Sequence, residues 1–406
     1  GMSSDVFCCY ACVGDAFLKA RIKTEGGIET CEHCGEDRES VSEFDLGQWI
    51  EEALEAHFEP GDGDDIPSII EDIAGLQPDL AQQIADELAS LAGYVASGGE
   101  TFYDCEDGYV VIQNPSGVRD RQWETFTQTV RSQARFFNRH AEEWLAKIFG
   151  PLSEDRTWRG QAVIKTCDPG TGFYRARHVA TEARAFDILR APAAQLGPLP
   201  TGAGSAGRMN AAGVSVFYGA FDVETCVAEI RPPVGSTVVS GRFELQRPLQ
   251  LLDFDLLEMV VAKASHFDPD YEMKMERALF LRAFGRRIAE PVMPGEEGFG
   301  YLATQIVADY LAQRAEPPLD GLIYRSTQTG GKGRNVVLFN HASRVFGDPN
   351  PAPASATAIV DPRLETLALV PDSIEITDIR AVTYEQPRRS VEIWEIELEE
   401  REHYQE

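Results

Sequence analysis

Two pairs of cysteines near the start of the chain constrain its fold more than any other feature. Cys9 and Cys12 form one Cys-x2-Cys pair, and Cys31 and Cys34 form a second pair after 18 intervening residues. Four thiolates at this spacing are typical of a tetrahedral zinc site. The spacing leaves no open coordination position for a substrate, so it predicts structural rather than catalytic zinc. Cys8 and His33 remain spare candidate ligands.

The overall composition narrows the classes of protein and of partner. The 406 residues carry a net charge of −29, which repels nucleic acid and anionic membranes. No run of about 18 apolar residues is present, so we expect no membrane span. The chain begins without a recognisable secretory signal, and its eight cysteines gather mostly at the N-terminus. This pattern favours bound metal over disulfides and a cytoplasmic location.

The first part of the chain after the cysteines has the periodicity of helices. Apolar residues recur at helical spacing over residues 44–58, 78–95 and 121–149, of which the last is the longest. The sequence GYVVIQ predicts a short strand. We therefore expect a zinc-binding knuckle over residues 1–40 and a helical domain over residues 41–152.

The second part has a different texture, because short β-rich runs alternate with loops and helices. Strands are predicted in AVIKTC, VSVFYGAF, STVVSGRFEL, LQLLDF, GLIYRS and NVVLF, and two further period-two runs lie in the tail. Helices are expected over residues 178–189, 223–230, 273–288 and 300–314. The whole chain is thus predicted to be α+β, with a mixed α+β domain over residues 155–406.

Polar side chains lie at the edges of three apolar runs in this second part of the chain. A polar group at such a place either finds a buried partner or lines a pocket. Three separate segments that each offer such groups outline a site. The segments are GFYRAR with Arg175 and Arg177, VSVFYGAFDVETCVAEIR with Tyr218 and Glu229, and DGLIYRSTQTGGKGRNVVLF with Ser326 and Asn335.

These segments, together with the helix YLATQIVADYLAQ, resemble the RES domain family in sequence and in order. The resemblance covers roughly residues 170–340. It implies a fold like that of ADP-ribosyltransferases and the activity of a toxin that degrades NAD. Such an enzyme cleaves the bond between nicotinamide and ribose and passes ADP-ribose to water or to phosphate. Transfer of ADP-ribose to a macromolecule is an alternative.

The resemblance also assigns roles to the polar residues. A guanidinium suits the pyrophosphate of NAD, which makes Arg175 the first choice and Arg177 the second. The carboxylate of Glu229 would stabilise an oxocarbenium-like transition state, and the phenol of Tyr218 would stack on a flat ring. Ser326 would hydrogen-bond a ribose hydroxyl or a phosphate oxygen, with support from Asn335 and the glycine-rich turn between them.

The N-terminal part resembles the HEPN-like domain that precedes some RES domains. The resemblance rests on CYAC, CEHCG and the segment QARFFNRHAEEWLAKIF. HEPN ribonucleases carry an Arg-x4–6-His motif, to which Arg135 and His140 correspond. The two lie five residues apart, about 140° around a helix, so they do not share one face closely. A ribonuclease is therefore the rival hypothesis, and sensing, dimerisation or restraint of the enzyme is the favoured role for this part.

The expected partners follow from these hypotheses. NAD is the expected substrate and zinc the expected bound metal. The RES resemblance implies a separate antitoxin protein as a candidate partner, and a second copy of the chain is another. The sequence leaves open which acceptor takes the ADP-ribose.

Overall fold

A computed structural model of the chain shows two compact units, each assembled from separate stretches of sequence. The first unit comprises residues 1–166, 205–213 and 250–324, and the second comprises residues 167–204, 214–249 and 325–406. Both combine helices with strands, which confirms the predicted α+β class. The structure describes residues 6–97, 99–112, 117–132, 139–200, 202–204, 206–289, 301–347 and 365–383.

The first unit opens with a small antiparallel sheet around the cysteines. Its strand order is β1–β3–β2, with β3 in the centre. The elements are β1 (Phe7–Cys9), η1 (Tyr10–Cys12), α1 (Ala16–Glu25), β2 (Gly27–Thr30) and β3 (Asp37–Ser42). Asp15 caps α1 by accepting a hydrogen bond from the backbone N–H of Leu18 at 2.8 Å.

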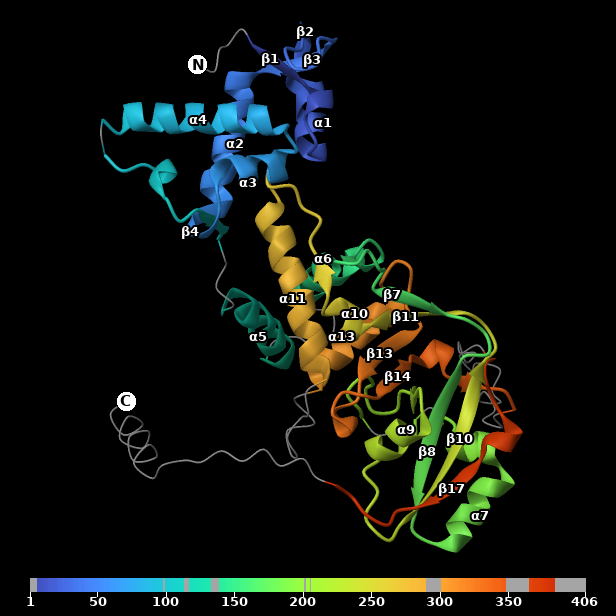
Figure 1. Cartoon of the computed structure of the whole chain (residues 1–406). Helices are drawn as coiled ribbons and strands as arrows, with labels where there is room; N and C mark the ends of the chain where they lie inside the picture. The colour runs from blue at the N-terminus through green and yellow to red at the C-terminus, as the bar shows by residue number, and fades with distance from the viewer. Residues whose placement is uncertain are drawn as a thin grey trace, which may run out of the picture. The chain divides into compact units, whose positions relative to one another are not determined.

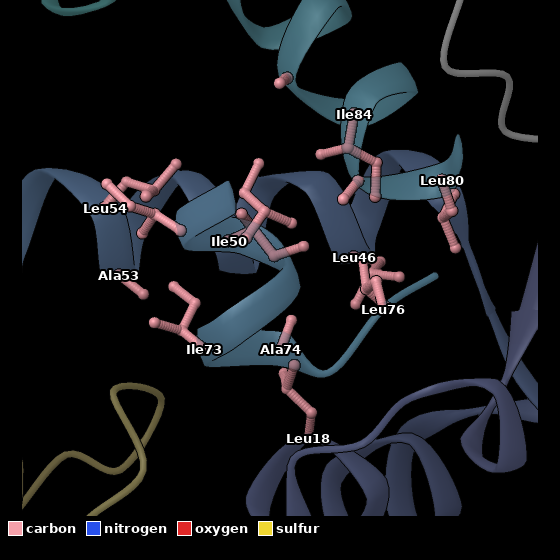
Figure 2. Close-up of a cluster of buried hydrophobic side chains, with 14 of the residues drawn as sticks. Leu18, Leu46, Ile50, Ala53, Leu54, Ile73, Ala74, Leu76, Leu80 and Ile84 are labelled. Carbon is pink, nitrogen blue, oxygen red and sulfur yellow. The ribbon is translucent and has the colours of Figure 1, made fainter. Parts of the chain in front are cut away.

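Three helices then form the apolar core of this part of the unit, as predicted for two of them. They are α2 (Glu43–His57), α3 (Ile66–Ala74) and α4 (Pro78–Val95). Figure 2 shows Leu46, Ile50 and Leu54 along one face of α2, with side chains of α3 and α4 beside them. The spacing of three and four residues puts these side chains on one face, which explains why the helix is amphipathic.

A strand that the sequence does not suggest follows α2. Residues Phe58–Asp64 form β4, which pairs with β5 (Tyr109–Val111) despite the loop-like sequence FEPGDGD. Gly63 approaches its partner closely, because a Cβ added there would lie 2.1 Å from the carbonyl oxygen of Tyr109. The glycines therefore permit β4 to pair with β5, although the sequence FEPGDGD is typical of a loop. The short helix η2 (Phe102–Asp104) precedes β5.

Aromatic side chains from three helices pack together in the same unit. The helices are α5 (Gly117–Ser132), α6 (Arg139–Phe149) and α11 (Tyr271–Ala289). Trp144 stacks on Phe126 with ring centroids 4.7 Å apart, and it meets Phe280 edge-on at 5.2 Å. Phe284 contacts both Trp123 at 5.4 Å and Phe149 at 5.1 Å. We call this set of six residues the aromatic seam.

Part of the aromatic seam lies in residues 121–149, which the sequence predicts as one helix. Both ends of that segment are helical, in α5 and α6, and residues 133–138 between them lie outside the described residues. Helix α13 (Leu302–Gln313) and helix α11 confirm the helices expected near residues 300–314 and 273–288. None of the described helices is long and apolar enough to cross a membrane.

Shorter elements complete the first unit. Strands β11 and β13 pair in parallel, and the Lys165 ammonium lies 3.0 Å from the buried carboxylate of Asp253 at the end of β11. The remaining elements are η3 (Gly150–Ser153), β6 (Arg156–Thr157), β7 (Ile164–Cys167), β11 (Leu249–Asp253), α10 (Phe254–Leu257), β12 (Val260–Val261) and β13 (Gly321–Arg325).

The second unit is built on a mixed sheet whose long strands β8 and β10 run side by side and antiparallel (Figure 1). The neighbours run in the order β15–β16–β10–β8–β9–β14, and β17 also pairs with β10. The strands are β8 (Gly172–Val179), β9 (Phe217–Ala220), β10 (Thr237–Leu245), β14 (Arg334–Leu338), β15 (Arg344–Val345), β16 (Glu365–Leu369) and β17 (Glu375–Asp378).

Short helices accompany this sheet. They are α7 (Glu182–Arg190), α8 (Pro192–Leu196), α9 (Val223–Glu229), η4 (Thr327–Thr329), η5 (Asn340–Ala342) and η6 (Pro371–Ser373). Helix α7 begins later than the predicted residue 178, because β8 continues through Val179 and Thr181 caps the helix. The second tail strand, predicted near residues 390–400, lies outside the described residues, and the predicted domain limits at residues 40, 152 and 155 stay predictions.

Candidate functional site

Helix α9 carries Glu229, and a strong N-terminal cap sets where this helix begins. One carboxylate oxygen of Asp222 accepts the backbone N–H of Thr225 at 2.7 Å, and the other accepts the Thr225 hydroxyl at 2.9 Å. The helix ends at Glu229, two residues before Arg231, which has a left-handed φ of 47°. The cap and the sharp end together fix Glu229 at the C-terminal turn of a short helix.

The structure brings Glu229, Ser326 and Asn335 together, and we call these three residues the Glu229 cluster. The Ser326 hydroxyl donates to Glu229 Oε1 at 2.5 Å, and Asn335 Nδ2 donates to the same oxygen at 2.8 Å. Ser326 is 0% exposed and Asn335 is 3% exposed, whereas Glu229 is half-buried. A carboxylate that accepts two buried hydrogen bonds is held in one orientation.

The turn between Ser326 and Asn335 is folded back on itself. The Ser326 N–H donates to the Gly333 carbonyl oxygen at 2.8 Å, and the Gly331 N–H donates to the Ser326 carbonyl oxygen at 2.9 Å. Gly333 also passes so close to α9 that an added Cβ would lie 1.9 Å from Thr225 Oγ1. The glycine-rich sequence is therefore required for contact between this turn and α9.

Strand register shows which other side chains share a face with Asn335. Asn335 pairs with Ala220 across β14 and β9, and Ala220 pairs with Tyr174 across β9 and β8. Tyr218 lies two residues before Ala220 and so points to this face as well. Tyr174 is half-buried against the buried cluster that includes Cys226 of α9. Tyr174 was not among the residues predicted for the site, although its place next to Arg175 in the FYRAR segment was a usable signal.

The two predicted arginines leave β8 on the opposite face. They alternate with Tyr174 and Ala176, so both point away from α9. Arg175 Nη1 donates to the Tyr218 carbonyl oxygen at 3.1 Å, and Arg177 Nη2 donates to the Gly197 carbonyl oxygen at 3.3 Å. Within the described part of the chain, neither guanidinium hydrogen-bonds Glu229.

Burial changes the electrostatics around these arginines. Burial, helped by the nearby positive charge of Arg177, lowers the pKa of Arg175 to about 10. Burial raises the pKa of the Cys226 thiol to about 12, although the charge of Arg175 acts in the opposite direction. Arg175 therefore stays protonated and Cys226 stays neutral at neutral pH, and the charge of Arg175 acts on Cys226 of α9.

The four predicted metal ligands also come together. The sulfur atoms of Cys9, Cys12, Cys31 and Cys34 lie within 4.8 Å of one another. The distances from Cys9 Sγ to the sulfurs of Cys12 and Cys34 are 3.8 and 3.6 Å, and Cys12 Sγ lies 3.8 Å from Cys31 Sγ. A tetrahedron of thiolates at about 2.3 Å from zinc has edges of about 3.8 Å. The donor set and spacing therefore fit zinc.

The surroundings favour a thiolate at Cys31, whereas burial raises the pKa of Cys9 and of Cys12. Burial acts to raise the pKa of Cys31, but hydrogen bonds from the backbone of Cys9, Cys34 and His33 outweigh it and lower the pKa to about 6. His33 does not join the four cysteines; its Nε2 lies 2.8 Å from the Glu43 carboxylate oxygen Oε1, which accepts the hydrogen bond. Cys8 points its sulfur toward the Cys9 carbonyl oxygen, 3.8 Å away. Neither spare candidate belongs to the group of four.

The described residues include only one member of the predicted ribonuclease pair. His140 is exposed in the first turn of α6, while Arg135 lies outside the described residues. The pair therefore stays a prediction.

Comparison with known families gives a match to part of the chain. The family model for the RES domain matches residues 173–360, a range that contains all three residues of the Glu229 cluster together with Arg175, Arg177 and Tyr218. No curated protein sequence matches the chain.

Proposed function

Because the chain contains a RES domain over residues 173–360, we propose that it is an enzyme that degrades NAD. The proposed reaction breaks the bond between nicotinamide and ribose and passes ADP-ribose to water or phosphate. The observation that carries the proposal is the Glu229 cluster, since a fixed, half-buried carboxylate is suited to stabilising a cationic ribose.

The proposed chemistry needs little from the protein beyond charge and orientation. The bond from the ribose C1′ to the pyridinium nitrogen breaks, and its electron pair stays with nicotinamide, which leaves as a neutral molecule. The positive charge that develops on the ribose faces the carboxylate of Glu229. Water or phosphate oxygen then bonds to C1′, and water loses a proton as it does so. A neutral leaving group requires no general acid.

Arg175, Arg177 and Tyr218 have proposed roles in binding NAD. Arg175 donates one of its N–H groups to the Tyr218 carbonyl oxygen and keeps further donors for a pyrophosphate, although its side chain leaves β8 on the face opposite to the Glu229 cluster. Although burial lowers the pKa of Arg175 to about 10, this value is still well above neutral pH, so the guanidinium stays charged. Tyr218 is half-buried on the face of Asn335, where a phenol ring could stack on nicotinamide or contact the ribose.

The experiment is to incubate the full chain with NAD and to follow nicotinamide by chromatography, with and without phosphate. We expect nicotinamide release, with ADP-ribose or its 1″-phosphate as the second product. Glu229→Gln should reduce the rate at least about 100-fold. Glu224→Gln is the matched control, because Glu224 is exposed on the same helix and should leave the rate unchanged.

Two outcomes would contradict the proposal. Intact NAD after prolonged incubation of the folded protein would exclude NAD cleavage. Label from adenine-labelled NAD that remains on a macromolecule would instead show transfer of ADP-ribose to that acceptor.

We also propose that zinc bound by the four cysteines has a structural role. All four positions around such an ion would be taken by protein sulfurs, which leaves none for a substrate. Elemental analysis of purified protein should give about one zinc per chain. A zinc content near zero in the folded protein would refute the site.

A further inference from the structure

Asn335 is an unusual residue for its place in the fold. It occupies a buried position of β14, where the strand sequence RNVVL is otherwise apolar after its first residue. Asparagine is disfavoured in strands, and a buried amide is costly unless it is hydrogen-bonded. A strand of this kind would ordinarily hold another apolar residue at this position. The amide therefore calls for an explanation in terms of what it contacts.

The contact with Glu229 fixes the orientation of the amide. Asn335 Nδ2 donates to Glu229 Oε1, and a flipped amide would direct its oxygen at that carboxylate oxygen instead. Asn335 Oδ1 is buried, and no donor lies within hydrogen-bond distance among the described residues. Among the described residues, the side-chain hydrogen bond of Asn335 is thus the one to Glu229.

The partners of Glu229 are electrically neutral. Ser326 supplies a hydroxyl and Asn335 an amide, both to Oε1, and no described residue forms an ion pair with Glu229. Arg175 and Arg177 of β8 point to the face of that strand opposite to Glu229. A cation beside the carboxylate would cancel much of its charge, whereas a neutral donor orients it and leaves the charge in place.

We propose that Asn335 is a positioning residue whose neutrality is the important property: it anchors one oxygen of Glu229 while the negative charge remains available to a cationic ribose. This inference rests on the proposed NAD cleavage and adds to it the reason for a neutral anchor. Because both donors bind Oε1, the proposal assigns Oε2 to the interaction with the substrate.

Two substitutions separate anchoring from neutrality. Asn335→Leu removes the donor and keeps the neutral charge, whereas Asn335→Lys can still donate a hydrogen bond but places an ammonium beside Glu229. If neutrality matters most, kcat should fall about 10-fold in the leucine variant and about 100-fold or more in the lysine variant, with KM within about twofold of wild type. Asn335→Ser, a shorter neutral donor, should recover part of the activity lost in Asn335→Leu.

The matched control is Asn340→Leu. Like Asn335, Asn340 donates a side-chain hydrogen bond in the second unit. Its acceptor is the backbone oxygen of Ser215, 2.8 Å away, and not Glu229. Its kcat and KM should equal those of wild type. A lysine variant milder than the leucine variant would overturn the inference, because anchoring alone would then explain the effect. A rise in KM at constant kcat would also overturn it and would make Asn335 a substrate contact.

A binding measurement keeps this inference separate from the proposed activity. The probes are a ribose-like pyrrolidine, which is protonated at neutral pH, and the neutral tetrahydrofuran of the same shape. We expect wild type and Asn335→Leu to bind the cation more tightly than the neutral ring, and Asn335→Lys to lose that preference. Equal preference in all three folded variants would refute the inference. Intact NAD with the preference present would refute the proposed activity alone.

Discussion

The cysteine centre and the Glu229 cluster are both small groups of polar atoms held in place by their surroundings, but they are assembled from the sequence in opposite ways. Cys9 and Cys34 are only 25 residues apart, and all four ligands lie on one small sheet and its turns. Glu229 is 97 residues from Ser326 and 106 from Asn335. Short spacing makes the first group readable as a motif, whereas the second group requires the fold to form first.

The largest expected difference between the two sites is the loss of stability when metal is removed from the cysteine centre. Metal binding stabilises the folded state directly, so a chelator or Cys31→Ser should cost on the order of several kcal/mol in the first unit. Thermal unfolding with and without chelator measures this. Cys105→Ser is the control, since Cys105 lies in the same unit but outside the group of four. An unchanged melting temperature after zinc is stripped would show that the sheet around the cysteines does not depend on metal.

A smaller effect is expected where the Glu229 cluster depends on close backbone contact. Gly333→Ala should destabilise the protein by about 1–3 kcal/mol, because the added Cβ would overlap Thr225. It should also lower the NAD cleavage rate, since Gly333 lies between Ser326 and Asn335. Gly93→Ala in α4, where a Cβ meets nothing within 4 Å, should stabilise by about 0.5–1 kcal/mol. Urea titrations would measure both, and wild-type stability of Gly333→Ala would contradict the close contact.

The helix caps of the two regions offer a test at about 1 kcal/mol. Asp65 accepts the backbone N–H of Ser68 at the start of α3, as Asp222 accepts that of Thr225 at the start of α9. Alanine at either position should cost about 1 kcal/mol, and asparagine should recover most of it. Only the change at Asp222 should also slow NAD cleavage. Equal rates for both alanine variants would separate the α9 cap from the site.

The smallest expected effect is a pH dependence in the first unit. Burial lowers the pKa of His57 and of His266, although Asp15, Asp72 and Glu272 act in the opposite direction. A histidine with a lowered pKa binds its proton more readily in the unfolded chain. Stability is therefore retained above the unfolded value of about 6.5 and falls as the pH decreases below it.

Thermal melts between pH 7 and 5.5 should show a decrease of a few degrees Celsius. His57→Phe and His266→Phe should each reduce this decrease, and His178→Gln, at an exposed position of β8, should not. A melting temperature that rises on acidification would contradict the expected effect of burying these two histidines.

The difference in sequence spacing also explains how much of each site could be predicted from the sequence. The cysteine spacing alone predicted all four members of the metal group, because local geometry allows few other arrangements. Glu229, Ser326 and Asn335 were selected as polar residues at the edges of apolar runs, and resemblance to the RES family supplied their roles. That Ser326 and Asn335 both donate to Oε1 of Glu229 could not be foreseen. The pairing of several strands decides whether Arg175 points toward α9 or away from it. The same pairing places Tyr174 on the face of Asn335, which the sequence alone does not show.

Local propensity failed most clearly at β4. Its proline and two glycines argue for a loop, yet the strand pairs with β5 because glycine allows close approach to the Tyr109 carbonyl oxygen. Helices with clear apolar faces, such as α2 and α4, were predicted well because one face must be buried. Tertiary contact thus overrode composition where side chains were smallest.

The aromatic seam limits how this chain can be shortened. Phe280 and Phe284 come from α11, whereas their ring partners Trp123, Trp144 and Phe149 precede residue 155. A truncated chain starting at residue 155 would keep two large rings with no native neighbours from α5 and α6, and exposed rings of this kind promote aggregation. The RES segment is therefore not a module that can be excised by a single cut at residue 155, because α11 shares its ring contacts with the helices before it.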